Sequence, residues 1–417
     1  MMGLDTAFFA ATAAEAEQRY VEFGNAITRY RGDRNKVTAN HRNVSRLSPA
    51  IRHRLITEFE VIDRTLTNHA FGQVEKFVQE VAWRLYWKGW LSLRPQIWRD
   101  FLDDLAELQH GWATDRIDAI VAGQTSIEVM GYFARELVET GYLHNHARMW
   151  FAGWWVHVER LPWQLGADFF YRHLLDADAA SNTLSWRWVA GLQTRGKSYL
   201  PRRSNLEKYL ADGILASHGG GLEQLNNPRA MIADEDELIR SREITRPFLT
   251  QSSHEPRQQS KRFGLIVHRE DLKPEAGPLQ HAKPDSVLVL DHRSQGEQAG
   301  DSSCKLAWIT TAQTDTLKRL TNYYDTAQVS LGGFLPIDQQ IRDWCSEQQI
   351  DQVSVMRPEV GPLADALTAT FDELSGHVTV CWVDRPEDLE ARQLATGGFF
   401  GFWKKYEKLL RQRNRAG

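Results

Sequence analysis

The sequence is poor in cysteine and lacks a long apolar run. Its 417 residues include three cysteines, Cys304, Cys345 and Cys381, which lie far apart in the chain. This spacing favours neither a disulfide scaffold nor a zinc site, so we expect a reduced, cytoplasmic protein without a metal. No apolar run approaches the ~20 residues that a membrane helix needs. The apolar segment 7–14 follows Asp5 and lacks a basic leader, which predicts an amphipathic helix rather than a signal peptide.

The chain also lacks a large excess of charge of either sign. Its formal net charge is −4 and 25% of its residues are charged, which gives no indication of nucleic-acid binding on its own. Two segments are nevertheless locally basic. Residues 29–54 contain eight Lys or Arg against one acid, Asp33. The second basic group consists of Arg195, Lys197, Arg202 and Arg203.

Apolar periodicity divides the chain into a helical part and an α/β part. A length of 417 residues suits two domains. Residues 1–225 repeat apolar side chains at intervals of three and four, which predicts an all-helical domain. Residues 226–258 are polar and read as a linker. Residues 259–417 alternate short apolar runs with helical windows, which predicts a doubly wound parallel sheet, although no G-x-G-x-x-G motif follows the first run. The runs expected as strands are 263–268, 287–291, 307–309, 353–355 and 378–382.

Residues 142–199 concentrate six tryptophans and several polar side chains. Helical spacing places Asn145 and Met149 on one face of a helix. Asp176 and Asp178 follow an amphipathic run, where they could bind hydroxyls or cap the next helix. We therefore expect a pocket here. Most of the other tryptophans of the helical part fit ordinary core packing.

These blocks resemble the FAD-binding core of the photolyase and cryptochrome family. Residues 141–149 (GYLHNHARM) resemble the family pattern G-W-x-H-N-R-x-R-M, and Trp163 stands at its D-W-R tryptophan. Residues 176–182 resemble D-x-D-x-A-x-N, and residues 186–191 resemble W-Q-W-A-x-G. Residues 77–84 (FVQEVAWR) resemble N-E-L-x-W-R-E-F. The resemblance implies FAD as the cofactor.

A further block near the start of the chain completes the expected cofactor site. Residues 43–49 (NVSRLSP) resemble the T-S-x-L-S-P run that holds the FAD diphosphate, with Val44 where the family usually has a hydroxyl. Hydroxyls and backbone N–H groups with cations nearby suit a diphosphate. Asn182 matches the position beside flavin N5. The cofactor-binding residues that the resemblance implies are Tyr30, Ser45, Arg46, Leu47, Ser48, Trp83, Arg84, Asn145, Arg148, Asp176, Asp178 and Asn182.

The resemblance also implies residues for the repair of pyrimidine dimers in DNA. Glu80 would hydrogen-bond a pyrimidine edge, and Trp83, one helical turn away, would form a stacking wall. The substrate side would be Glu80, Trp83, Asn145, Met149 and Trp188. Trp186 and Trp163 match the inner members of an electron-transfer chain, and the outer member would be Trp112, with Trp98 second. A pyrimidine dimer flipped out of the DNA duplex would enter this pocket, and photolyases are a known example of such base flipping. Phosphate contacts would come from Arg34, Arg195, Lys197 and Arg202.

Three functions fit this sequence. The first is a light-driven photolyase, which the retained Glu80 and Asn145 favour. The second is a cryptochrome-type flavin light sensor without repair activity. His146 in place of a family Arg, and Pro201 near an expected Arg, weaken DNA contact and favour the sensor. The third is a plain flavoprotein without photochemistry, supported by the divergent segment 120–131.

The α/β part resembles, more faintly, the domain that photolyases carry at their N-terminus. Residues 265–272 (LIVHREDL) stand where the family has W-F-R-x-D-L-R, and residues 399–405 resemble its closing F-T-P-F helix. This order predicts a circular permutation, which neighbouring termini at a domain surface would allow. We expect a monomer. The lesion type, an antenna chromophore and a signalling partner stay open.

Overall fold

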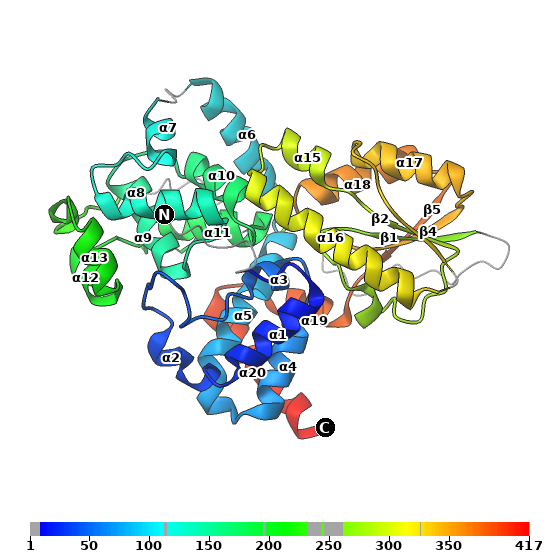
Figure 1. Cartoon of the computed structure of the whole chain (residues 1–417), viewed down its shortest axis with the longest axis horizontal. Helices are drawn as coiled ribbons and strands as arrows, with labels where there is room; N and C mark the ends of the chain where they lie inside the picture. Colours follow the sequence, from blue (N-terminus) through cyan, green and yellow to red (C-terminus); the bar gives the residue numbers. More distant parts are fainter. Residues whose placement is uncertain are drawn as a thin grey trace.

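The protein has a helical half and an α/β half, which lie on the left and the right of Figure 1. The computed structural model describes residues 9–111, 115–194, 197–231, 243–245, 262–325 and 327–416. No helix within these segments is long and apolar enough to cross a membrane. The helices of the first half are α1 (Ala13–Gly24), α2 (Tyr30–Asp33), α3 (Ser48–Arg52), α4 (Glu58–Asn68), α5 (Phe71–Ser92), α6 (Gln96–Gly111), α7 (Asp115–Val121), α8 (Glu128–Thr140), α9 (Asn145–His157), α10 (Trp163–His173), α11 (Ala179–Val189), α12 (Arg203–Tyr209) and α13 (Asp212–His218), with the 3-10 turns η2 (Ile27–Arg29) and η3 (Leu222–Leu225).

Helices α5 and α9 form the centre of the helical half. Helix α5 has 22 residues and is therefore about 33 Å long. Helix α9 buries Trp150, Trp154 and Trp155 completely, and a helix that is apolar around its circumference belongs inside a core. It starts after His144, whose ring Nδ1 accepts a hydrogen bond from the backbone N–H of His146 at 3.1 Å. Helix α9 packs against α8, α10 and α11.

The α/β half contains a sheet of five parallel strands in the order β3-β2-β1-β4-β5. The chain runs from the centre of the sheet to one edge and then from the centre to the other, so the predicted doubly wound sheet is confirmed. The strands are β1 (Phe263–Val267), β2 (Ser286–Val289), β3 (Gln328–Leu331), β4 (Gln352–Met356) and β5 (Thr379–Val383).

Helices cover both faces of this sheet (Figure 1). Successive side chains of a strand point to opposite faces. Leu265 and Val267 accordingly belong to the same apolar cluster as α16 (Ser303–Tyr323), whereas Ile266 packs with α17 (Ile337–Glu347) and α18 (Pro362–Glu373). The remaining elements here are α15 (Arg293–Gln298) and the 3-10 turn η4 (Pro274–Ala276).

Three local predictions were wrong. The run 307–309 is not a strand but part of α16, which buries Trp308, Ile309 and Ala312 at helical spacing. Strand β3 escaped prediction because it is a four-residue edge strand that is not fully buried. The helix expected over 7–14 begins at Ala13, where a capping box from Thr12 starts it. Residues 1–8 lie outside the described part.

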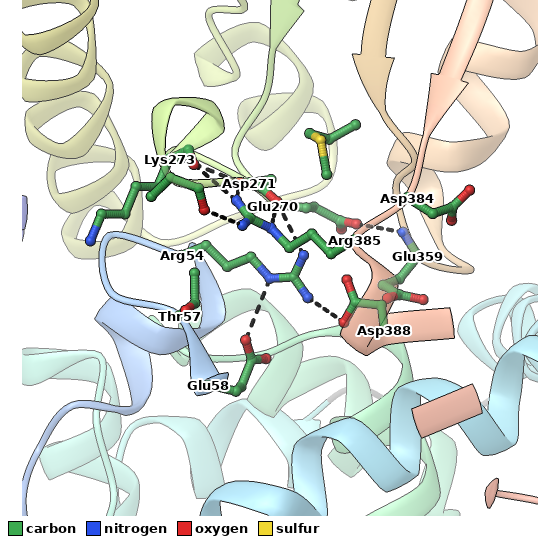
Figure 2. Close-up of polar contacts among 12 residues, drawn as sticks. Arg54, Thr57, Glu58, Glu270, Asp271, Lys273, Glu359, Asp384, Arg385 and Asp388 are labelled. Carbon is green, nitrogen blue, oxygen red and sulfur yellow. Dashed lines mark hydrogen bonds and ion pairs between the residues drawn. The ribbon is translucent and has the colours of Figure 1, made fainter. Parts of the chain in front are cut away.

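Buried ion pairs join the two halves (Figure 2). Arg52 donates to Glu270 at 2.9 Å, and Arg54 donates to Asp271 at 3.1 Å. Glu270 and Asp271 lie just beyond the carboxyl end of β1, where doubly wound sheets commonly bind ligands. Because the helical half covers this place, a ligand site is better sought inside the helical half.

The last two helices, α19 (Pro386–Leu394) and α20 (Phe399–Ala416), pack on α5 instead of on the sheet. The hydroxyl of Tyr86 donates to the backbone carbonyl of Gly397 at 2.9 Å. At Gly89 an added Cβ would lie 2.9 Å from the Cβ of Ala395, so the small residue permits the close approach. Residues 399–405 therefore complete the helical half, contrary to the expectation that they close the α/β part.

Candidate cofactor and substrate site

A cavity of about 650 Å³ lies between α2, α5, α9 and α11 in the helical half. Its volume falls within the roughly 300–1,000 Å³ that is typical of small-molecule and cofactor sites. Fifteen residues that were predicted for the site line this cavity. They are Tyr30, Arg34, Ser45, Arg46, Ser48, Glu80, Trp83, Arg84, Asn145, Arg148, Met149, Asp176, Asn182, Trp186 and Trp188.

Two buried carboxylates with arginine partners form a charged region of this site. Arg148 donates to Asp176 at 2.9 Å, and Arg84 pairs with Asp178. Burial opposes ionisation of Asp176, but Arg148 and Arg84 outweigh it and hold the pKa of this carboxyl below its ordinary value. A hydrogen bond from Ser48 acts in the same direction. The result is an ionised aspartate whose arginines are held in place at the cavity wall.

The turn from Asp178 into α11 positions the next polar groups. The Asp178 carboxylate accepts a hydrogen bond from the backbone N–H of Ser181 at 2.7 Å and so caps α11. Asn182, one residue further, donates to the carbonyl of Ala167 at 2.8 Å, which fixes its amide. The hydroxyl of Ser181 lines the cavity and has no hydrogen-bond partner among the described residues. It is thus a buried polar atom that a ligand could satisfy.

Glu80 and Arg34 both line the cavity and form an ion pair with each other. The sequence predicted separate roles for them, a pyrimidine contact for Glu80 and a phosphate contact for Arg34. Burial raises the pKa of the Glu80 carboxyl, and Arg34 opposes that rise only in part. Glu80 therefore already has a charged partner in the absence of a substrate.

Trp83 lines the cavity, and its ring packs against the first residue of α20. The ring of Phe399 stacks on it with centroids 3.5 Å apart and an interplanar angle of 7°. Tyr86 meets both rings edge-on, at 5.6 Å from Trp83 and 5.5 Å from Phe399. This packing fixes the plane of the indole that was predicted to be a stacking wall.

The predicted electron-transfer tryptophans occupy different surroundings. Trp186 lines the cavity and meets Phe170 and Trp155 edge-on, with centroids 5.0 and 6.2 Å apart. Trp163 is buried outside the cavity lining and stacks on Phe101 at 5.5 Å. Trp98, the second candidate for the outer member, is buried beside Phe101. Trp112 lies outside the described residues.

Other predicted residues stand apart from the cavity. Leu47 is fully buried in the core, and Asp178 lies behind the lining, where it pairs with Arg84. Lys197 and Arg202 are exposed, and neither lines the cavity. Arg195 lies outside the described residues. Within those residues, no group of three or more potential metal ligands occurs.

The structure adds lining residues that the sequence reasoning missed. Asn205 and Tyr209 reach the cavity from α12, and His146 and Tyr199 lie beside them. His146 Nδ1 is 2.9 Å from the carbonyl of Asn35, so this ring is anchored to the loop after α2. The four-residue spacing of Asn205 and Tyr209 on one helical face was the signal that could have revealed them.

Comparisons with known proteins show which families and structures this chain resembles. Residues 77–210 match the family model of the FAD binding domain of DNA photolyase. A deoxyribodipyrimidine photo-lyase of Streptomyces griseus is 32% identical over 153 residues, which cover 36% of this chain and 32% of the relative. A chloroplastic/mitochondrial cryptochrome DASH of Ostreococcus tauri is 33% identical over 132 residues, covering 28% of this chain and 23% of the relative. A solved class III photolyase from Agrobacterium tumefaciens aligns with TM-score 0.41 and 25% identity over 49% of this chain and 44% of that chain.

The family model places a FAD-binding domain within the helical half, over residues 77–210. The alignments with the curated photolyase and cryptochrome relatives span about a third or less of the length of those relatives. The residues present fit FAD. The cavity is large enough, Arg84 and Arg148 supply fixed cations, and Ser181 offers an unpaired hydroxyl. That the order of the two halves is a circular permutation stays a prediction.

Proposed function

We propose that the protein is an FAD-dependent photolyase that uses blue light to repair cyclobutane pyrimidine dimers in DNA. The observation that carries this proposal is the convergence of Glu80, Trp83, Asn145, Met149 and Trp188 on the same cavity as the expected flavin contacts. When bound in its reduced form, FAD would supply one electron to the dimer on excitation and take it back once two carbon–carbon bonds have opened. No net oxidation or reduction of the DNA results.

The residues of the chain would hold the dimer and exclude water. Trp83, fixed by Phe399, offers a flat apolar surface for a flipped-out pyrimidine. Glu80 would exchange its ion pair with Arg34 for a hydrogen bond from the pyrimidine ring. Arg34, once released, would be free to pair with a phosphate. This exchange reconciles the two roles that the sequence predicted with the ion pair between them.

A cryptochrome-type flavin sensor is the second candidate. The Arg34–Glu80 ion pair favours it, because a carboxylate that already has a partner needs no substrate to satisfy it. In that case the same cavity would hold FAD, and the ion pair would close its substrate side. A monomeric state and a cytoplasmic location stay predictions under either function.

Two measurements on the purified full-length chain test the proposal. A visible absorption spectrum should show non-covalently bound FAD, and the reduced protein should remove cyclobutane dimers from an oligonucleotide only in the light. Bound flavin with neither dimer removal nor any preference for dimer-containing DNA would support the sensor instead. A flavin-free protein would contradict both candidates.

A further inference from the structure

The exposed face of α20 is positively charged. Lys404, Lys405 and Lys408 are all exposed, and none has a carboxylate partner among the described residues. Two other cations of this helix are already occupied. Arg411 donates to Glu407 at 2.8 Å, and Arg413 pairs with Glu390 of α19. Among the described side chains of α20, the lysines are therefore the cations that remain available to an external anion.

This charged face begins at the wall of the cavity. Phe399, the first residue of α20, stacks on Trp83, which lines the cavity. At 1.5 Å per residue, Lys404 lies about 7.5 Å and Lys408 about 13.5 Å further along the helix axis. Phe400, Lys404 and Lys408 follow one another at intervals of four residues and so share one face, and Phe400 is 75% exposed. A cationic stripe with one exposed aromatic ring thus extends from the substrate wall.

We propose that α20 holds the phosphate backbone of the DNA strand whose dimer enters the cavity. The proposal rests on the photolyase function and assigns part of the DNA contact to a helix outside the segment that matches the family model. Spaced ammonium groups suit a polyanion, because each neutralised phosphate releases condensed counterions. The exposed ring of Phe400 could stack on a base next to the dimer, as aromatic side chains do in single-strand binding.

The packing of α20 argues against an anionic membrane as the partner. A helix that lies on a membrane must place an apolar face in the lipid. The apolar face of α20 is not free, since Phe402, Trp403 and Tyr406 are buried within the helical half. Its contact with the cavity wall favours a partner that also enters the cavity, which a nucleic acid does.

A pair of matched double variants tests this assignment. K404Q/K408Q removes two charges from α20, and K283Q/K318Q removes two exposed lysine charges from the α/β half. Binding of a fluorescent, undamaged duplex would be measured in the dark by anisotropy between 50 and 200 mM salt. We expect K404Q/K408Q to reduce the magnitude of the slope of log K against log salt by about 2, because each phosphate contact contributes about 0.9 to this slope. At 100 mM salt the variant should bind about 10- to 60-fold more weakly than the wild type. K283Q/K318Q should match the wild type.

The outcomes separate this inference from the proposed function. An unchanged slope in K404Q/K408Q, or an equal loss in K283Q/K318Q, would overturn the role of α20 even if the wild type repairs dimers. A reduced slope would support it even if no repair occurs. If K404Q/K408Q instead loses binding to phosphatidylserine vesicles and keeps its affinity for DNA, the partner is a membrane and the assignment is wrong. Flavin absorbance should be equal in all variants, because neither pair of lysines lines the cavity.

Discussion

Replacing Arg54 by Met should destabilise the folded protein severely. Arg54 is buried between the two halves and contacts Glu58 at 3.4 Å, Asp271 at 3.1 Å and Asp388 at 2.7 Å (Figure 2). Together with Lys88 and Arg385, it balances these three carboxylates, which are themselves nearly inaccessible to water. Methionine has a similar length but no charge, so the substitution leaves one negative charge uncompensated in the interior. Breaking such a buried network by removing one partner typically costs about 3–5 kcal/mol.

Chemical denaturation followed by circular dichroism at 222 nm measures this loss. The matched control is Arg342→Met, because Arg342 also contacts two carboxylates, Asp338 and Glu373, but on the exposed surface. Exposed ion pairs contribute about 0–1 kcal/mol, so the control should change stability little. If R54M loses no more free energy of unfolding than R342M, the buried network does not hold the two halves together. Because whole domains typically have about 5–15 kcal/mol of stability, R54M should be assayed at low temperature, where it retains the fold.

Further predictions concern the cavity and its surroundings. E80Q should reduce the preference for dimer-containing over intact DNA by roughly 5- to 150-fold, the equivalent of about 1–3 kcal/mol, in competition binding. W186F should abolish flavin photoreduction but keep the flavin content, which absorbance under illumination would show. Burial opposes ionisation of Glu58, but Lys88 and Arg54 lower its pKa to about 2. A lowered pKa stabilises the fold above the ordinary value of 4.5, and this contribution is lost as the pH falls from 4.5 towards 2, so acid unfolding of E58Q should lack that component.

The sequence predicted those parts of the site that depend on contiguous residues. The block 141–149 forms the start of α9, and the block 176–182 forms the cap of α11, so neighbours in the chain are neighbours at the cavity. The alternation of strands and helices after residue 262 likewise revealed the doubly wound sheet, because strand burial is a local pattern. An edge strand such as β3, with little burial, leaves no such pattern.

Pairings between distant segments could not be predicted in this way. Glu80 has the helical position that a substrate contact requires, yet nothing local to it indicates Arg34, which lies 46 residues earlier. Phe399 is 316 positions beyond Trp83, and its aromatic run predicts the end of the α/β part. Only the folded chain shows that α19 and α20 return to α5, where Gly89 allows their close approach. The cavity wall at Trp83 is therefore built from segments that lie far apart in the sequence, and a truncation of the chain after residue 225 would remove the ring that holds Trp83 in place.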